Sequence, residues 1–218
     1  MDDISINDFA RDPLGYGASA HRKWCLAKTA AGFPAEFSTP ATTEDLKDPI
    51  LWLSQAHALA ESAKNVIMSN PNLVKMPVPI QASCDCQYRA IALMLVGYSL
   101  EISLKSMMIL ETGIEDFLKQ EKQIKHHRLE ELAQFIPNLS KKDKAILRAL
   151  THYVYWAGRY PDPGLKRVHD LEDIFSISEK HQVTLQDILT ISARVMSHVD
   201  VVLTQTEKDG DTGSVKNS

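Results

Sequence analysis

The sequence contains few cysteines, and they do not form an obvious pair. Its 218 residues include three, Cys25, Cys84 and Cys86. An odd number leaves at least one thiol free, and Cys84 and Cys86 are separated by a single residue, which is too close for an unstrained disulfide. Because free thiols persist in reducing compartments, we expect a cytoplasmic protein.

The chain also lacks a long hydrophobic run. The longest uncharged apolar stretch, residues 90–100, ends at Glu101. It falls well short of the roughly twenty residues needed to cross a bilayer. Residues 1–13 are acidic and contain no apolar segment typical of a signal peptide. We therefore expect residues 90–100 to lie in a buried core helix, and we expect no membrane association.

Several motifs that carry metal or enzymatic chemistry are missing. No second C-x-x-C and no H-x-x-x-H lies near Cys84 and Cys86, so we expect no metal site. The sequence has no glycine-rich phosphate loop, no G-x-S-x-G and no H-E-x-x-H. These absences predict no cofactor and leave nucleophilic cysteine catalysis without support.

The periodicity of the apolar residues predicts helices almost everywhere, and no segment alternates as a strand would. We expect an all-α fold, a four- to five-helix up-and-down bundle with an N-terminal extension. Residues 1–42 form a partly helical arm, 43–204 the bundle and 205–218 a disordered tail. Capping boxes are expected at Ser140 and Thr184. The predicted helices cover residues 18–32, 43–69, 83–111, 114–121, 127–135, 141–157, 170–177 and 184–204.

One charged pair lies within the most apolar predicted helix. Glu101 and Lys105 are four residues apart and share a helix face, so they can form an ion pair. Their neighbours are nearly all apolar, and a desolvated charge needs a partner. The pair either satisfies itself or meets a third charge from another helix, for which Arg159 is the candidate.

Arg159 follows an aromatic-rich stretch, residues 151–157, and precedes two prolines. Gly158 can take a positive φ and end the helix, and Pro161 and Pro163 prevent its continuation. A rigid backbone that presents a guanidinium suits a buried carboxylate such as Glu101, or a phosphate. Tyr160 either packs on the bundle or joins such a site.

A basic stretch follows the apolar helix although the net charge is −4. This net charge argues against nucleic-acid binding by the whole surface, but a local positive patch can still bind a polyanion. The alternative is a solvated face. His126 or His127 can also cap the next helix and bond to a neighbouring one. The basic residues are Lys119, Lys122, Lys125, Arg128, Lys141, Lys142, Lys144 and Arg148.

Two arginine–histidine pairs occur at helical spacing. Arg148 with His152, and Arg194 with His198, are each four residues apart. In such a pair the arginine can stabilise the charge developing on a phosphodiester while the histidine moves a proton. The alternative is that these are unrelated surface residues, which is common on helices.

Three segments in order, "AIALMLVGYSLEISLKSMMIL", "HHRLEELA" and "YWAGRYPDP", resemble the HEPN superfamily of helical domains in prokaryotic conflict systems. The resemblance implies a helical bundle, often dimeric, associated with RNA or nucleotides. Active members carry arginine, four to six residues, then histidine, as a metal-independent RNase site. Here Arg148 and His152 have three residues between them, and Arg159 and His169 have nine.

The resemblance therefore favours a homodimeric domain that binds RNA or a nucleotide, in a bacterial stress or defence system, without catalysis. The predicted binding residues are Arg159, Lys105, Glu101, His127 and Tyr160. One alternative is a noncatalytic scaffold for dimerisation or for an operon-encoded protein partner. A weaker alternative is an RNase that uses Arg148 and His152.

Overall fold

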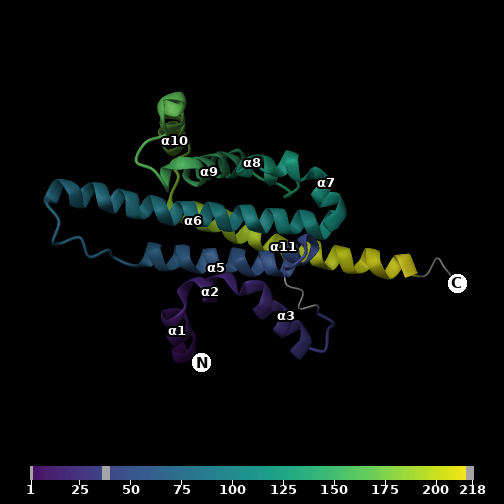
Figure 1. Cartoon of the computed structure of the whole chain (residues 1–218). Coiled ribbons are helices and arrows are strands. Elements are labelled where there is room, and N and C mark those ends of the chain that lie inside the picture. The colour runs from purple at the N-terminus through teal and green to yellow at the C-terminus, as the bar shows by residue number, and fades with distance from the viewer. Residues whose placement is uncertain (1, 36–39, 215–218) are drawn as a thin grey trace. The chain divides into compact units, whose positions relative to one another are not determined.

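The computed structural model describes residues 2–35 and 40–214, and within these ranges the chain is helical with no strand (Figure 1). The all-α prediction is thus confirmed. Residues 1–51 and 52–218 form two compact units, which are described separately below.

The N-terminal unit holds α1 (Asp2–Arg11), α2 (Pro13–Ala18), α3 (Ala20–Ala30) and α4 (Thr43–Leu46). Its most connected polar group is the carboxylate of Asp48, which accepts hydrogen bonds from Trp24 Nε1 at 2.7 Å and from Lys28 Nζ at 3.2 Å. Partial burial would raise the pKa of Asp48, but these bonds outweigh it and hold the pKa below its ordinary value.

The helix predicted for residues 43–69 is divided at Pro49. Thr42 and Asp45 form a capping box on α4, and the next helix, α5, runs over Pro49–Met68. Because proline has no N–H and clashes with the preceding turn, it starts a helix more readily than it continues one. Asp48 Oδ1 accepts the Ile50 N–H at 2.9 Å, which supports the new start.

The C-terminal unit is built around α6 (Val78–Thr112), which packs against α11 (Leu185–Ser214) and against the turn η1 (Tyr153–Ala157). α6 begins before the predicted Ser83 because Pro79 fits the first turn of a helix. The remaining elements are α7 (Ile114–Ile124), α8 (Leu129–Leu132), α9 (Lys141–His152), η2 (Leu165–Arg167) and α10 (Val168–His181). Fully buried side chains on α6 include Leu100, Leu104 and Met107.

Polar bonds connect α5 to α6. Ser99 Oγ donates to the Ala56 carbonyl at 2.8 Å, in the buried part of the unit. The guanidinium of Arg89 donates to carbonyls at the end of α5, which have no partner within their own helix. These carbonyls belong to Val66, Ile67 and Ser69, at 3.0–3.3 Å.

Among the described residues, α6 is long and apolar enough to cross a membrane by length and composition alone. Its most apolar window has a mean hydropathy of 1.5, and 56% of that window is buried inside the chain. A core helix meets the same criterion, and the burial of Glu101 among α6 side chains fits that description.

Several helix ends agree with the sequence. Both predicted capping boxes form: Ser140 exchanges bonds with Asp143, and Thr184 with Asp187. Gly113 follows α6 with a φ of +78°. In contrast, α11 continues past the expected end at residue 204 to Ser214, where a disordered tail was predicted. Residues 215–218 of that tail lie outside the described residues.

Candidate functional site

Glu101 forms the centre of a closed polar network. Its side chain is 8% exposed, and each carboxylate oxygen has a partner. Lys105 Nζ donates to Oε1 at 2.7 Å, and His127 Nδ1 lies 2.7 Å from Oε2. Lys105 also donates to the His126 carbonyl at 3.1 Å, so the network joins α6 to the segment before α8.

The direct Arg159–Glu101 bridge considered from the sequence is wrong. Arg159 Nη1 instead donates to the Tyr98 hydroxyl at 3.3 Å. Tyr98 lies one turn before Glu101 on α6, and both oxygens of Glu101 are already engaged by Lys105 and His127. Arg159 thus contacts α6, as expected, but Glu101 does not neutralise its positive charge.

Aromatic rings connect the network to the arginines. The His127 ring makes edge-to-face contacts with Tyr98, at 6.0 Å between ring centroids, and with Tyr155, at 5.0 Å. The Arg167 guanidinium lies 4.9 Å from the Tyr155 ring centroid, within the range of a cation–π contact. His127 therefore contacts both the ring over which Arg167 lies and the tyrosine whose hydroxyl accepts a hydrogen bond from Arg159.

The backbone under this cluster is a π-helical turn. In η1, the Gly158 N–H reaches back five residues to the Tyr153 carbonyl at 3.1 Å. Such turns insert one extra residue into a helix and occur often at functional sites. The predicted continuous helix over residues 141–157 is therefore α9 followed by this turn, which displaces Tyr155 and Trp156 from α-helical positions.

The prediction of a positive φ at Gly158 is wrong. Its φ is −91°, which any residue can adopt. Glycine is required by close packing instead, because a Cβ atom there would lie 2.3 Å from the Met94 Cβ and 3.0 Å from the Ala90 carbonyl oxygen. The π turn is thus pressed directly against α6.

A hollow of about 380 Å³ lies beside the turn, and we call it the π-turn pocket. Trp156 lines it, is 6% exposed, and has an indole Nε1 that is buried without an acceptor among the described residues. A buried donor without an acceptor costs roughly 1–3 kcal/mol, so it needs an explanation. The pocket's other lining residues are Tyr155, Tyr160, Pro161, Asp162, Pro163, Gly164 and Arg167.

Two exposed arginines lie at or next to this pocket, together with the exposed carboxylate of Asp162. Arg159 and Arg167 are both exposed, and the Arg159 guanidinium lies 5.5 Å from the Tyr160 ring centroid. No carboxylate of the described residues forms an ion pair with either arginine. A guanidinium held over a ring can meet a phosphate with two parallel N–H donors, and exposed tyrosine offers a stacking face.

Arg148 and His152 are brought together, but by a carboxylate. Arg148 Nε lies 3.1 Å from Asp173 Oδ2, and His152 Nε2 lies 2.9 Å from the same oxygen. Asp170 adds a second contact, 3.7 Å from His152 Nδ1. The pair that was predicted as a catalytic candidate therefore connects α9 to α10.

Arg194 and His198 do not share a site. Arg194 pairs with Asp143 at 3.2 Å and donates to the carbonyls of Pro137 and Asn138 at 2.7 and 2.8 Å. The ring of His198 instead faces Phe135, with 6.2 Å between centroids. Arg194 therefore closes the loop before α9, next to its capping box.

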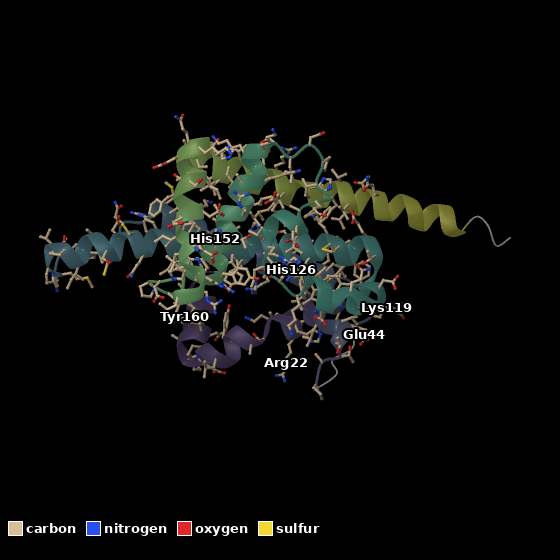
Figure 2. The ribbon with its side chains drawn as sticks, turned by 90° about the horizontal axis from the view of Figure 1, so that it is seen from above. Arg22, Glu44, Lys119, His126, His152 and Tyr160 are labelled. Atoms are coloured by element: carbon tan, nitrogen blue, oxygen red, sulfur yellow. The ribbon has the colours of Figure 1, made fainter. Side chains whose placement is uncertain are left out.

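Much of the basic stretch is neutralised locally. Lys119 pairs with Asp116, and Arg128 with Glu131. Lys142 pairs with Asp187 at 2.8 Å, which lowers the pKa of Asp187. Figure 2 shows Lys119 well apart from Tyr160, so this lysine does not belong to the π-turn pocket. The side chain of Lys122 lies outside the described residues.

His126 has a different role from His127. Its Nδ1 accepts the Arg128 N–H at 3.2 Å, which makes it a local cap before α8. Partial burial, and after it the charge of Arg128, lower the pKa of His126. The ring is therefore neutral near pH 7, as an acceptor nitrogen requires. His127 makes the contact to a neighbouring helix that one of the two was predicted to make.

No group of three or more metal-ligating side chains gathers among the described residues. None of the three cysteines forms a disulfide: Cys25 is buried, Cys84 partly buried and Cys86 exposed. The two thiols on α6 therefore have no clustered ligands near them within the described ranges.

Sequence reasoning missed Tyr98, Tyr155, Trp156 and Arg167 as members of the cluster. A usable signal was present, because four of the eight residues 153–160 are aromatic. Their convergence depends on the π turn, however, and nothing in the sequence marks that extra residue.

No family model matches the chain, and no curated protein or solved structure matches it either.

Proposed function

We propose that this chain is a HEPN-like helical bundle that binds RNA or a nucleotide at the π-turn pocket without cleaving it. The proposal includes a homodimer, a cytoplasmic location and a role in a bacterial stress or defence system. The support is an all-helical chain in which the three resembling segments meet: α6, the segment before α8, and η1 are joined through Glu101, His127 and Tyr155.

One observation carries the proposal: two exposed arginines lie over tyrosine rings beside a pocket. Arg167 covers Tyr155, and Arg159 lies against Tyr160. Base stacking on an aromatic side chain contributes about 1–3 kcal/mol per base. A guanidinium adds charge-assisted hydrogen bonds to phosphate. This combination suits a nucleotide better than it suits an apolar ligand or an unmodified peptide.

Behind these groups, the Glu101 network has a positioning role. Lys105, Glu101 and His127 satisfy one another, so they are poor candidates for direct contact with a ligand. His127 instead fixes Tyr98 and Tyr155, which in turn contact Arg159 and Arg167. The predicted binding residues Lys105, Glu101 and His127 thus act through the rings.

A noncatalytic role is supported by the state of Arg148 and His152. Both side chains bond to Asp173, so the positive charge of Arg148 is matched before any phosphodiester arrives. The spacing between them is also shorter than that of active members of the resembling family.

The test is binding of a fluorescein-labelled single-stranded oligoribonucleotide, measured by anisotropy at fixed, low salt. The double variant Arg159→Ala/Arg167→Ala should lose affinity by about 100-fold or more, if each arginine contact is worth at least the roughly 1.5 kcal/mol of a charged hydrogen bond. A matched control, Lys141→Ala/Lys144→Ala, removes two exposed cations of the basic stretch and should lose less than about threefold, because distant cations act only through screened charge.

The opposite pattern, with the lysine variant losing RNA and the arginine variant keeping it, would place binding on the basic stretch and overturn the site. If the wild type does not bind the oligoribonucleotide at low salt, the proposed function is wrong.

The alternative, a scaffold for an operon-encoded protein partner, is favoured by a different surface. An apolar hollow of about 480 Å³ lies between α5, α6 and α11, with walls that include Ala63, Val96, Leu100 and Met196. The scaffold alternative would be supported if a protein partner bound to this surface and the chain had no affinity for RNA. The weaker RNase alternative requires that His152→Ala abolish any RNA cleavage seen with EDTA present.

A further inference from the structure

We infer that the connection between α5 and α6 is a membrane-contact element, which inserts aliphatic side chains into the surface of an anionic lipid bilayer. This inference is independent of the proposed function, because it concerns a different part of the C-terminal unit. It starts from the exposed large aliphatic side chains of residues 68–80, a segment that we call the apolar tip. They are Met68, Val74, Met76, Val78 and Ile80.

The apolar tip lies at one end of the C-terminal unit. Val74 is 84% exposed and Val78 is 76% exposed, so both side chains are nearly as open to water as in an unfolded chain. In both views the first turns of α6 extend past the other helices of this unit (Figures 1 and 2). Exposed apolar groups that project in this way can enter a bilayer surface while the rest of the unit stays in water.

Much of the backbone of the apolar tip is already hydrogen-bonded within the chain. Three of its residues are prolines, which have no N–H. The N–H groups of Leu73 and Met76 donate to carbonyls of the tip at 3.0 and 2.9 Å, and the Gln81 side chain donates to the Met76 carbonyl. Because an unpaired backbone group opposes entry into a low-dielectric layer, these internal bonds favour insertion.

The tip is also fixed to the two helices that it joins. Arg89 of α6 donates to the Ile67 and Ser69 carbonyls at the end of α5, at 3.1 and 3.0 Å. The hydroxyl groups of Ser69 and Tyr88 form a further bond between the same two segments. The fold therefore holds the exposed side chains in place, which leaves less conformational entropy to be lost on insertion.

The charge of the apolar tip is complementary to an anionic surface. Residues 62–84 contain no Asp or Glu, although the whole chain has a net charge of −4. Their two cations are Lys64 and Lys75. Lys75 lies between two of the exposed aliphatic residues, is itself exposed, and forms no ion pair with the described residues. Anionic lipid headgroups attract a lysine in this position, so they are the partner that fits both the apolar side chains and the charge.

The sequence predicts no membrane association, because no uncharged apolar run is long enough to span a bilayer. Contact with one surface needs no such run, since the side chains enter only the boundary between headgroups and acyl chains. The inferred contact therefore departs from that expectation without requiring a spanning helix.

The experiment is co-sedimentation of the full chain with vesicles of equal parts phosphatidylcholine and phosphatidylglycerol, at fixed low salt. The wild type should sediment with these vesicles. Val74→Asp/Val78→Asp should lower the partition coefficient by about 30-fold or more, which is the effect expected from half-burying two valine side chains. Thermal unfolding followed by circular dichroism should be unchanged, because both positions are exposed.

Val168→Asp/Val201→Asp is the matched control, since it makes the same chemical change at two exposed valines of α10 and α11. It should lower the partition coefficient by less than about threefold, because the added charges act only through screened repulsion. Lys75→Ala should weaken binding to the mixed vesicles by about fivefold and leave binding to pure phosphatidylcholine vesicles unchanged, as expected for one lysine near an anionic surface.

Two kinds of result would overturn the inference. If the wild type sediments with neither kind of vesicle, or if the two double variants lose the same amount of binding, the apolar tip is not a membrane contact. If the wild type ignores vesicles and Val74→Asp/Val78→Asp converts a dimer to a monomer in analytical ultracentrifugation, the tip binds a second copy of the chain instead.

Discussion

Two arginine clusters of the C-terminal unit lie close together in the sequence and differ in what surrounds them. At the end of α9, Arg148 meets Asp173, which also holds His152. Beyond η1, Arg159 and Arg167 meet tyrosine rings, and no carboxylate of the described residues pairs with them. The first cluster is compensated within the fold; the second retains its charge.

The difference indicates that the two arginine clusters have different roles. A guanidinium that is matched by a carboxylate stabilises the packing of two helices, here α9 and α10. A guanidinium held over a ring keeps most of its hydrogen-bond donors available for an anion. Four substitutions, taken from the greatest change in stability to the least, test this difference between the clusters.

The largest effect is expected for the buried network that supports the second cluster. Glu101→Ala leaves the partly buried Lys105 without its carboxylate partner and should lower the free energy of unfolding by about 3–5 kcal/mol. Urea unfolding followed by circular dichroism measures this change. The control is Glu61→Ala, which removes the exposed Glu61–Lys64 pair and should cost less than about 1 kcal/mol. Equal losses of unfolding free energy in the two variants would show that the Glu101 network stabilises the fold no more than an exposed ion pair does.

The next effect concerns the contact between the π turn and α6. Gly158→Ala places a Cβ against the Met94 Cβ and the Ala90 carbonyl, neither of which can swing away freely, and should destabilise by about 1–3 kcal/mol. Thermal unfolding measures it. Gly17→Ala, at a position with nothing within 4 Å of the new Cβ, should be neutral or stabilising. A neutral Gly158→Ala variant would mean that the turn is not pressed against α6.

A smaller effect, dependent on pH, should mark the compensated cluster. Partial burial would raise the pKa of Asp173, but hydrogen bonds from His152 and Arg148 outweigh it and hold the pKa below 3.8. The ionised carboxylate therefore stabilises the fold above pH 3.8, and this contribution is lost as the pH falls below that value. Asp173→Asn should cost about 0.5–1 kcal/mol at pH 7 and should flatten the loss of stability in acid. An unchanged acid slope would contradict the assigned pairing.

The smallest effect on stability is expected at the second cluster itself. Arg159→Ala removes an exposed side chain with one long bond to Tyr98, so the free energy of unfolding should change by less than about 0.5 kcal/mol. Chemical unfolding of wild type and variant measures it. A loss of several kcal/mol would instead assign Arg159 a structural role and favour the scaffold.

The parts of the fold that were predicted correctly depend on local chemistry. Ser140 and Thr184 cap helices through residues three positions away, and Gly113 follows α6 with a positive φ. The error at residues 43–69 was also local, since Pro49 was treated as an interior helix residue.

The candidate site was harder to predict than the helix ends, because the contacts that form it join residues far apart in the sequence. Gly158 is required by Ala90 and Met94, more than sixty positions earlier, so its conformation could not be read from its neighbours. Arg159 was expected near Glu101 and lies one turn away, at Tyr98. Arg167 was missed because its ring contact depends on how the proline-containing loop returns.

The central claim, that a nucleotide binds over the π turn, is tested most directly by photocrosslinking. The full chain would be irradiated with a single-stranded oligoribonucleotide carrying 4-thiouridine and 6-thioguanosine, and the crosslinked peptides identified by mass spectrometry. We expect crosslinks within residues 155–167, at Tyr155 or Tyr160 above all. Crosslinks confined to residues 119–148, with none in the π-turn segment, would contradict it.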